Sequence, residues 1–357
     1  LVAAIVIGGL FARSAYSTQK AANEGSHVRG RRYLKDREAL REFTRISTHE
    51  CGGGGVGVRL HPSLPPMSRK RECRHFLIFG SVGSGKTQTI MPMAVAAIES
   101  GSKLLVFDIK GDFAAQLPGQ VHLLAPWDNR SLICDVAFDV SDRSAARELA
   151  AGIIPESAGS PMWSSAARAV LVGCILSLIS EKPGTWGFRD LAEIAFRGDP
   201  EFYQDVMRKY FPEGLAAVTG SSVTTVGILI NMVSFLSVVS DLAEAWPDPS
   251  APGEGFSIRR WLSGDDSLQR TVVLAANGRF KQLQMSFARG LLNIAAQTVA
   301  DPNQVGESSS RRIFIFLDEF PQLGSVPSVG TLLEIGRSRG IRVVLGVQDI
   351  AQMRDVY

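Results

Sequence analysis

The residues of this chain that are best suited to do chemistry form one octet, Gly80-Ser-Val-Gly-Ser-Gly-Lys86-Thr87, which satisfies the pattern G-x-x-x-x-G-K-[ST] in full. Glycines in such a loop let the backbone wrap so that successive N–H groups face a phosphate. Lys86 would reach the β- and γ-phosphates of a nucleoside triphosphate, and the Thr87 hydroxyl would bind Mg²⁺. The residues predicted to contact the nucleotide are Gly80, Ser81, Val82, Gly83, Ser84, Gly85, Lys86 and Thr87.

A second group of candidate residues is acidic. Asp318 and Glu319 directly follow the apolar run at 312–317. Asp318 would hold the magnesium ion, usually through water, and Glu319 stands where it could polarise the attacking water. Two acids after a strand can also form a mere surface turn, but the complete phosphate loop in the same chain favours the catalytic interpretation.

Short apolar runs must position these groups. Residues 75–79 are almost continuously apolar and lead directly into the octet, which predicts a strand buried on both faces, followed by a helix over 88–99. Residues 341–347 predict another buried strand, and Gln348 at its tip could contact the γ-phosphate and report its loss. The run at 103–107 ends in Asp108-Ile-Lys-Gly-Asp112. Ligands lie at the carboxyl ends of parallel strands, so these acids are candidate site neighbours, although a turn explains them equally well.

The spacing of the two groups predicts an insertion. Lys86 and Asp318 are 232 positions apart, much more than neighbouring strands of one α/β core require. The region 141–258 has helical patterns and few strand-like runs, so we predict an inserted all-α domain there. The fold class is then α/β, with a parallel central sheet. The nucleotide-binding domain is expected in two parts, 56–140 and 259–357, of which the second is truncated.

The chain begins inside an apolar run, 1–12, that is too short to cross a bilayer, which takes about 20 residues. Arg13, Lys20 and a basic stretch at 28–33 follow it. Positive charge after an apolar run predicts the end of a transmembrane helix over 1–12, with its flank in the cytoplasm. A buried helix or strand of a soluble protein is the alternative.

Residues 13–55 are expected to form a basic juxtamembrane segment and linker, with an amphipathic helix at 34–46 and a flexible glycine-rich joint at 51–57. Residues 1–75 hold 14 Lys and Arg against 6 Asp and Glu, whereas the rest of the chain has more acids than bases. This excess suits a phospholipid surface or nucleic acid, or simply a solvated positive face.

The composition excludes other classes of protein. With 45% hydrophobic and 20% charged residues, the chain has enough apolar side chains for a packed core and is neither disordered nor collagen-like. Its four cysteines contain no C-x-x-C pair, which argues against a zinc ribbon or a disulfide scaffold.

Several of these segments together resemble one family, the type IV coupling proteins, which are membrane-anchored ATPases of bacterial conjugation and type IV secretion. They are related to the FtsK and HerA DNA pumps. The segments are Gly80 to Thr87, Phe-Leu-Asp-Glu-Phe-Pro-Gln-Leu-Gly at 316–324, Gly-Arg-Ser-Arg-Gly at 336–340 and Val347-Gln348, with the helical insert between the first two. The resemblance covers essentially the whole chain, and the segment 316–324 is its most specific part.

The resemblance implies a RecA-like P-loop core that assembles as a ring of six beneath the bacterial inner membrane, with the ATPase domain in the cytoplasm. Such a ring would use ATP and Mg²⁺ to drive relaxase-bound single-stranded DNA, or a protein substrate, toward the secretion channel. Gln348 matches the phosphate-sensing glutamine of the family. Arg337 matches the position proposed for an arginine finger that acts on the ATP of the neighbouring subunit, with Arg339 or Arg289 as substitutes. The family's core continues beyond position 357, so part of the sheet is expected to be missing.

Two other functions stay open. A chromosomal DNA pump of the FtsK kind would share the motor. A docking platform would bind ATP only to assemble and present substrate, but it would not need intact Lys86, Thr87, Asp318 and Glu319 together. No nucleic-acid-binding motif is present, so the sequence permits DNA translocation without demonstrating it.

Overall fold

A computed structural model describes residues 33–357 except 82, 158–160, 220–221, 250, 252–254, 265–269, 276, 350, 352–353 and 355–357. The predicted transmembrane segment at 1–12 and Val82 of the octet lie outside the described residues. The described residues before position 49 and those from position 49 onward belong to separate compact units. The larger unit contains the sheet and the predicted site.

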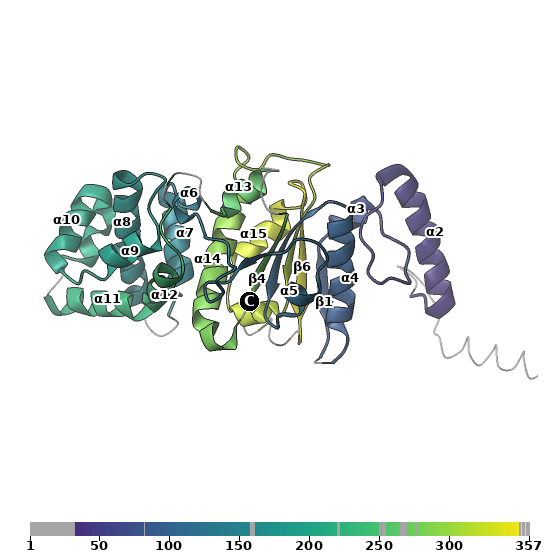
Figure 1. The fold of residues 1–357 in the computed structure, drawn as a ribbon, viewed down its shortest axis with the longest axis horizontal. Coiled ribbons are helices and arrows are strands. Elements are labelled where there is room, and N and C mark those ends of the chain that lie inside the picture. The colour runs from purple at the N-terminus through teal and green to yellow at the C-terminus, as the bar shows by residue number, and fades with distance from the viewer. Residues whose placement is uncertain are drawn as a thin grey trace, which may run out of the picture. The chain divides into compact units, whose positions relative to one another are not determined.

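Six parallel strands form the central sheet, in the order β1-β6-β5-β2-β4-β3 (Figure 1). The strands are β1 (Phe76–Phe79), β2 (Lys103–Asp108), β3 (His122–Leu124), β4 (Thr271–Ala275), β5 (Ile313–Leu317) and β6 (Ile341–Val347). Because β6 lies between β1 and β5, the strand before the phosphate loop and the strand before the acids are separated by the strand that precedes Gln348.

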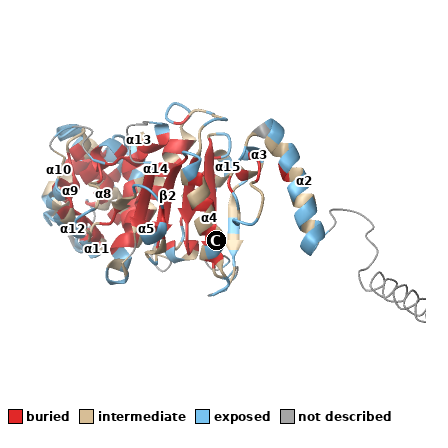
Figure 2. Ribbon diagram, turned by 45° about the vertical axis from the view of Figure 1, so that its right-hand side comes forward, coloured by how far each residue is buried: buried red, intermediate tan, exposed pale blue. Residues whose placement is uncertain are grey.

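The inner strands are buried on both faces, as their unbroken apolar runs predict (Figure 2). Alternate side chains of β2 enter different hydrophobic clusters: Leu104 and Val106 pack with α4 (Lys86–Glu99) and α5 (Asp112–Gln116), whereas Leu105 and Phe107 pack with α14 (Lys281–Ala300). Helix α15 (Ser328–Ile335) lies on the same side as α14. Helices therefore cover both faces of the sheet.

Strand β1 does not match its prediction. Leu77 is 55% exposed and Phe79 is 61% exposed, while Phe76 and Ile78 pack against the cluster that contains α4. The prediction of a strand buried on both faces is therefore wrong. In the described part of the chain β1 is an edge strand that pairs with β6 alone, so only one of its faces is covered.

The described residues between β3 and β4 are mainly helical. In order, the helices are α6 (Val136–Asp139), α7 (Arg143–Ile153), α8 (Pro161–Glu181), α9 (Phe188–Ala195), α10 (Pro200–Tyr210), η1 (Pro212–Ala217), α11 (Ser222–Phe235), α12 (Ser237–Ala245) and α13 (Ile258–Ser263). Helix α7 crosses α14 at two glycines: a Cβ added at Gly152 would lie 2.5 Å from the Cα of Gly290. The boundaries of a separate all-α domain remain a prediction.

One described helix, α8, is long and apolar enough to cross a membrane, and the bent pair 223–235 and 237–245 would pass the same test as one span. The core helix of a soluble protein also passes it, and 61% of the apolar window of α8 is buried inside the protein.

Helix α2 (Asp36–Gly54) is longer than expected. The sequence places a flexible joint at 51–57, yet the helix includes most of the glycine run. Glu50 fixes its last turn, because its carboxylate accepts hydrogen bonds from Arg71 Nε at 2.7 Å and from Ser68 Oγ at 2.7 Å. The short α3 (Arg69–Glu72) then leads to β1.

Candidate active site

The phosphate loop connects β1 to α4 and is tied to β6, because Gly80 N donates to Val347 O at 3.1 Å. Gly83 and Gly85 have φ angles of 78° and 89°, which L side chains rarely adopt. A Cβ at Gly80 would lie 2.4 Å from Ser84 Oγ. The backbone conformation therefore favours glycine at positions 83 and 85, and a side chain at position 80 would displace Ser84, as expected of a phosphate-wrapping loop.

Lys86 lies inside this loop and is only 8% exposed. Its ammonium donates to Gly80 O at 2.6 Å and to Ser81 O at 3.3 Å. Thr87 follows it in the first turn of α4, half-buried. The amino end of α4 carries partial positive charge and points its free N–H groups at the loop, so the loop, Lys86 and the helix all favour an anion at one place.

The strand order brings the other predicted groups to the same edge of the sheet. Phe79 is paired in register with Val347, and Leu317 with Leu345. The phosphate loop, Gln348 and the acid pair thus follow the carboxyl ends of three adjacent strands. This edge is where ligands bind in open parallel sheets. Gln348 is half-buried.

Asp318 is 3% exposed, and its Oδ1 has no hydrogen-bond partner among the described residues. Burial raises the pKa of this carboxyl, and the nearby Glu319 raises it further, whereas the charge of Lys110 lowers it. A buried carboxylate oxygen without a donor is unusual and fits a ligand such as a hydrated cation. Asp318 and Thr87 are therefore suited to hold Mg²⁺ together with waters and phosphate oxygens.

Glu319 is 1% exposed and has a φ of 53°, in the left-handed region. Its Oε1 accepts a hydrogen bond from Lys110 Nζ at 3.0 Å. No sequence pattern marks Lys110 as a site residue. Only the pairing of β2 with β5 shows that a residue just after β2 can reach a residue just after β5.

Asp108 has a structural role, and the interpretation as a turn is confirmed. Its Oδ1 accepts from Gly111 N at 2.9 Å and its Oδ2 from Ala114 N at 2.9 Å. Burial raises the pKa of Asp108, and these backbone donors oppose that shift. The carboxylate thus shapes the connection between β2 and α5.

Arg337 lies at the opposite edge of the sheet from the phosphate loop. It follows α15 and precedes the first residue of β6, so it is at the amino ends of the strands, exposed beside a cavity of about 740 Å³. Arg337 is therefore not placed to contact a nucleotide bound at the phosphate loop of the same chain. Of the two substitutes, Arg339 donates to Val305 O, and Arg289 donates to Ser286 Oγ at 3.2 Å from a half-buried place on α14, where burial lowers its pKa.

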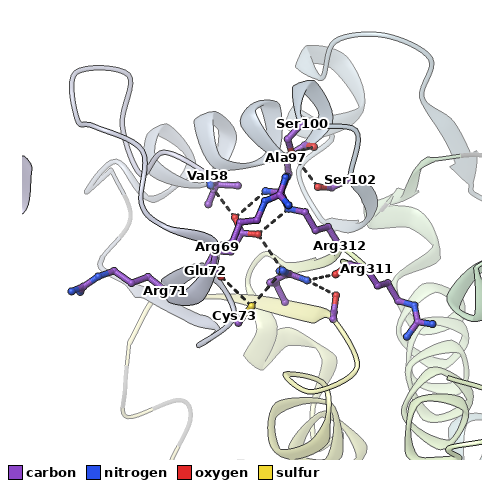
Figure 3. Close-up of polar contacts among 12 residues, drawn as sticks. Val58, Arg69, Arg71, Glu72, Cys73, Ala97, Ser100, Ser102, Arg311 and Arg312 are labelled. Atoms are coloured by element: carbon purple, nitrogen blue, oxygen red, sulfur yellow. Dashed lines mark hydrogen bonds and ion pairs between the residues drawn. The ribbon is translucent and has the colours of Figure 1, made fainter. Parts of the chain in front are cut away.

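A cluster of buried charge occupies this amino edge (Figure 3). Glu72 is fully buried and accepts hydrogen bonds from Val58 N at 3.0 Å and from Arg312 Nε and Nη2, both at 2.9 Å. Arg342, 1% exposed, lies 3.2 Å from the same carboxylate and donates to the carbonyls of Arg311 and Gly340, each at 2.6 Å. This carboxylate is saturated with donors and has no capacity left for a ligand.

Comparisons with known proteins agree with this arrangement. A family model described as the type IV secretion-system coupling protein DNA-binding domain matches residues 59–357. The coupling protein TraD of Escherichia coli K12 is 23% identical over 299 residues, which is 82% of this chain. The chain spans about two fifths of the length of TraD, since the match covers 40% of it.

Solved structures of the bacterial conjugative coupling protein TrwB have the same fold. Its trigonal form with sulphate matches with a TM-score of 0.75 and 21% identity, over 93% of this chain and 75% of that one. Its complex with ADP and Mg²⁺ matches with a TM-score of 0.72 and 21% identity, over 93% of this chain and 76% of that one. The predicted α/β fold class, a RecA-like P-loop core with a parallel sheet, is confirmed.

Proposed function

The chain belongs to the family of type IV secretion-system coupling proteins, and from this premise we propose that it is the ATP-hydrolysing motor of such a system. The observation that carries the proposal is the assembly at the carboxyl edge of the sheet. A complete phosphate loop with a buried Lys86 lies there beside Gln348 and the buried acids Asp318 and Glu319. A platform that only bound nucleotide could use Asp318 to hold Mg²⁺, but it would have no use for Glu319, whose role is to polarise water.

Each residue then has a role. The loop N–H groups and Lys86 bind the phosphates, and Thr87 and Asp318 hold Mg²⁺. When bound, the cation neutralises charge on the β- and γ-phosphates. Glu319 orients and polarises the attacking water. Gln348 contacts the γ-phosphate, so that release of this phosphate is transmitted to β6.

Arg337 supports the proposal of a ring. Because it lies at the edge of the sheet away from its own phosphate loop, it can serve as an arginine finger only toward the ATP of another subunit. We propose a homo-hexamer in which each Arg337 completes the neighbouring site and stabilises the charge of the transition state. Hydrolysis then depends on assembly.

The proposed cargo is relaxase-bound single-stranded DNA or an effector protein, delivered to the type IV secretion channel at the bacterial inner membrane. The family match to a DNA-binding domain supports DNA as cargo. The apolar run at 1–12, followed by the basic excess of residues 1–75, supports an inner-membrane anchor with the ATPase in the cytoplasm.

ATP hydrolysis by the full-length protein, with and without single-stranded DNA, tests the proposal. We expect turnover that DNA stimulates and that Lys86→Ala lowers at least about 100-fold, since a preorganised charge at the phosphates is removed. Lys209→Ala, on the surface of α10, is the matched control and should leave turnover unchanged. ATP binding without turnover under any DNA would instead identify a docking platform.

A further inference from the structure

The structure places an unpredicted ammonium group against the acid pair. Lys110 Nζ lies 3.0 Å from Glu319 Oε1, and the two side chains differ in exposure, 45% for Lys110 and 1% for Glu319. The hydrogen bond to Glu319 raises the pKa of Lys110. The contact is thus a charged hydrogen bond with its carboxylate in a buried place, where such bonds are stronger than on an open surface.

The direction of this contact follows from the order of the strands. On one side of β5 lie β6 and β1, which are followed by Gln348 and the phosphate loop. On the other side lies β2, and Lys110 comes two residues after its end. Lys110 therefore binds Glu319 from the β2 side, away from the phosphate loop.

Both partners of the pair stand on fixed backbone. Asp108 fastens the turn that carries Lys110 through its two hydrogen bonds to Gly111 N and Ala114 N. Glu319 has a left-handed φ of 53°, which is unfavourable for a non-glycine residue and persists only where the surroundings impose it. A strained residue with a buried charge needs a partner that holds its side chain in one orientation.

Lys110 is the cationic side chain that contacts Glu319 among the described residues, so it can hold the Glu319 carboxylate in place. Lys86, the other ammonium of the site, donates to the carbonyls of its own loop. The adjacent Asp318 adds negative charge beside Glu319, and like charges repel. Without Lys110, the buried carboxylate of Glu319 would lose its cation and would turn toward solvent or another donor.

We propose that Lys110 is a positioning residue for Glu319. Its ammonium holds Oε1 from the β2 side, so that Oε2 is presented to the water that attacks the nucleotide. This inference rests on the proposed ATPase function and adds to it a residue that acts only through Glu319. Since Lys110 lies on the far side of Glu319 from the phosphate loop, its loss should reduce the rate of hydrolysis and spare nucleotide binding.

Steady-state kinetics of Lys110→Met and Lys110→Arg in the full-length protein test this division. We expect Lys110→Met to lower kcat about 10- to 100-fold, because a misplaced catalytic group can cost up to about 100-fold, with the KM for ATP changed less than about twofold. Lys110→Arg keeps a cation and should restore most of the rate. Lys182→Met breaks the comparable Lys182–Asp190 pair in the helical region and should leave kcat unchanged.

Three results would overturn the proposal: an unchanged kcat in Lys110→Met, a loss that appears in KM, or an equal loss in Lys182→Met. A wild-type protein with no turnover would instead overturn the ATPase function on which the inference rests. An active wild type beside an equally active Lys110→Met overturns the positioning role alone.

A double-mutant cycle with Glu319→Gln gives an independent readout. Single-turnover hydrolysis at excess enzyme can follow the slow variants. If Lys110 acts through Glu319, adding Lys110→Met to Glu319→Gln should change the rate less than about twofold, because the positioned carboxylate is already absent. If the two losses multiply, Lys110 acts on the reaction by another route and the positioning role is refuted.

Discussion

The two edges of the sheet bury charge in opposite ways. At the amino edge, the carboxylate of Glu72 receives donors from Val58 N and Arg312 and an ion pair from Arg342. At the carboxyl edge, Asp318 Oδ1 is equally hidden from solvent, yet it has no donor among the described residues.

This difference distinguishes a buried charge with a structural role from a buried charge with a role in ligand binding. A buried ion that the protein satisfies by itself stabilises one arrangement of the chain, since removing a partner leaves the other charge uncompensated. A buried ion that the protein leaves unsatisfied lowers the stability of the free protein and favours a ligand that supplies the missing contact. The same buried strands begin at the Glu72 cluster and end beside the acid pair, so burial of charge alone does not identify the nucleotide site.

The largest effect should come from breaking the amino-edge cluster. Glu72→Ala leaves Arg312 and Arg342 buried without their acid and is expected to lower the free energy of unfolding by about 3–5 kcal/mol. Chemical denaturation measures this loss. Glu213→Ala, which removes a surface partner of Arg143, should cost less than about 1 kcal/mol. A similar cost for both variants would mean that the buried cluster is not a structural centre.

At the carboxyl edge the same kind of change should have the opposite effect on stability. Asp318→Asn removes a buried charge whose pKa burial has raised, so the nucleotide-free protein should gain up to about 1 kcal/mol. Its affinity for nucleotide in the presence of Mg²⁺ should fall about 100-fold, because a cation ligand is lost. Calorimetric titration with and without Mg²⁺ measures the affinity, with the exposed Asp205→Asn as control. A destabilised nucleotide-free variant would show that Asp318 is structural.

Asp139 provides a third case for this comparison, because the hydrogen-bond donors to its buried carboxylate are a hydroxyl and two backbone N–H groups, all of them neutral. Its donors are Ser257 Oγ, Ile258 N and Arg259 N, and burial raises its pKa to about 6. The folded state thus holds the proton more tightly than the unfolded chain, so protonation stabilises the fold as the pH falls through about 6. Relative to Asp139→Asn, the wild type should gain roughly 2 kcal/mol between about pH 7 and pH 4.5. Parallel stability curves for the two proteins would show that this acid is not perturbed.

The smallest effect concerns the space around Asp318. A Cβ at Gly346 would lie 2.8 Å from Asp318 Oδ1, so Gly346→Ala must displace the carboxylate. We expect a loss of about 1 kcal/mol of stability and about tenfold lower kcat. Gly330→Ala, where nothing lies within 4 Å of the added methyl group, should raise stability slightly because alanine favours the helix. A hydrolysis rate unchanged in Gly346→Ala would mean that the position of Asp318 is not critical.

The sequence by itself determined the local elements. The octet forms its loop because Gly83 and Gly85 adopt positive φ angles, and this requirement acts within a few residues. The runs at 103–107, 313–317 and 341–347 become buried strands because long apolar stretches must leave water. The acids at 318–319 follow such a strand directly, which made them recognisable without any knowledge of their neighbours.

Only the tertiary structure decided which elements meet. The order β1-β6-β5-β2 puts Lys110 against Glu319 and leaves β1 at an edge, and neither result can be deduced from local pattern. Arg312 and Arg342 look like charges at the ends of strands, yet they converge on Glu72 from more than 200 positions away in the chain. Strand pairing and burial of charge depend on the global packing of the chain, because the free energy of each contact is set by neighbours that are distant in sequence.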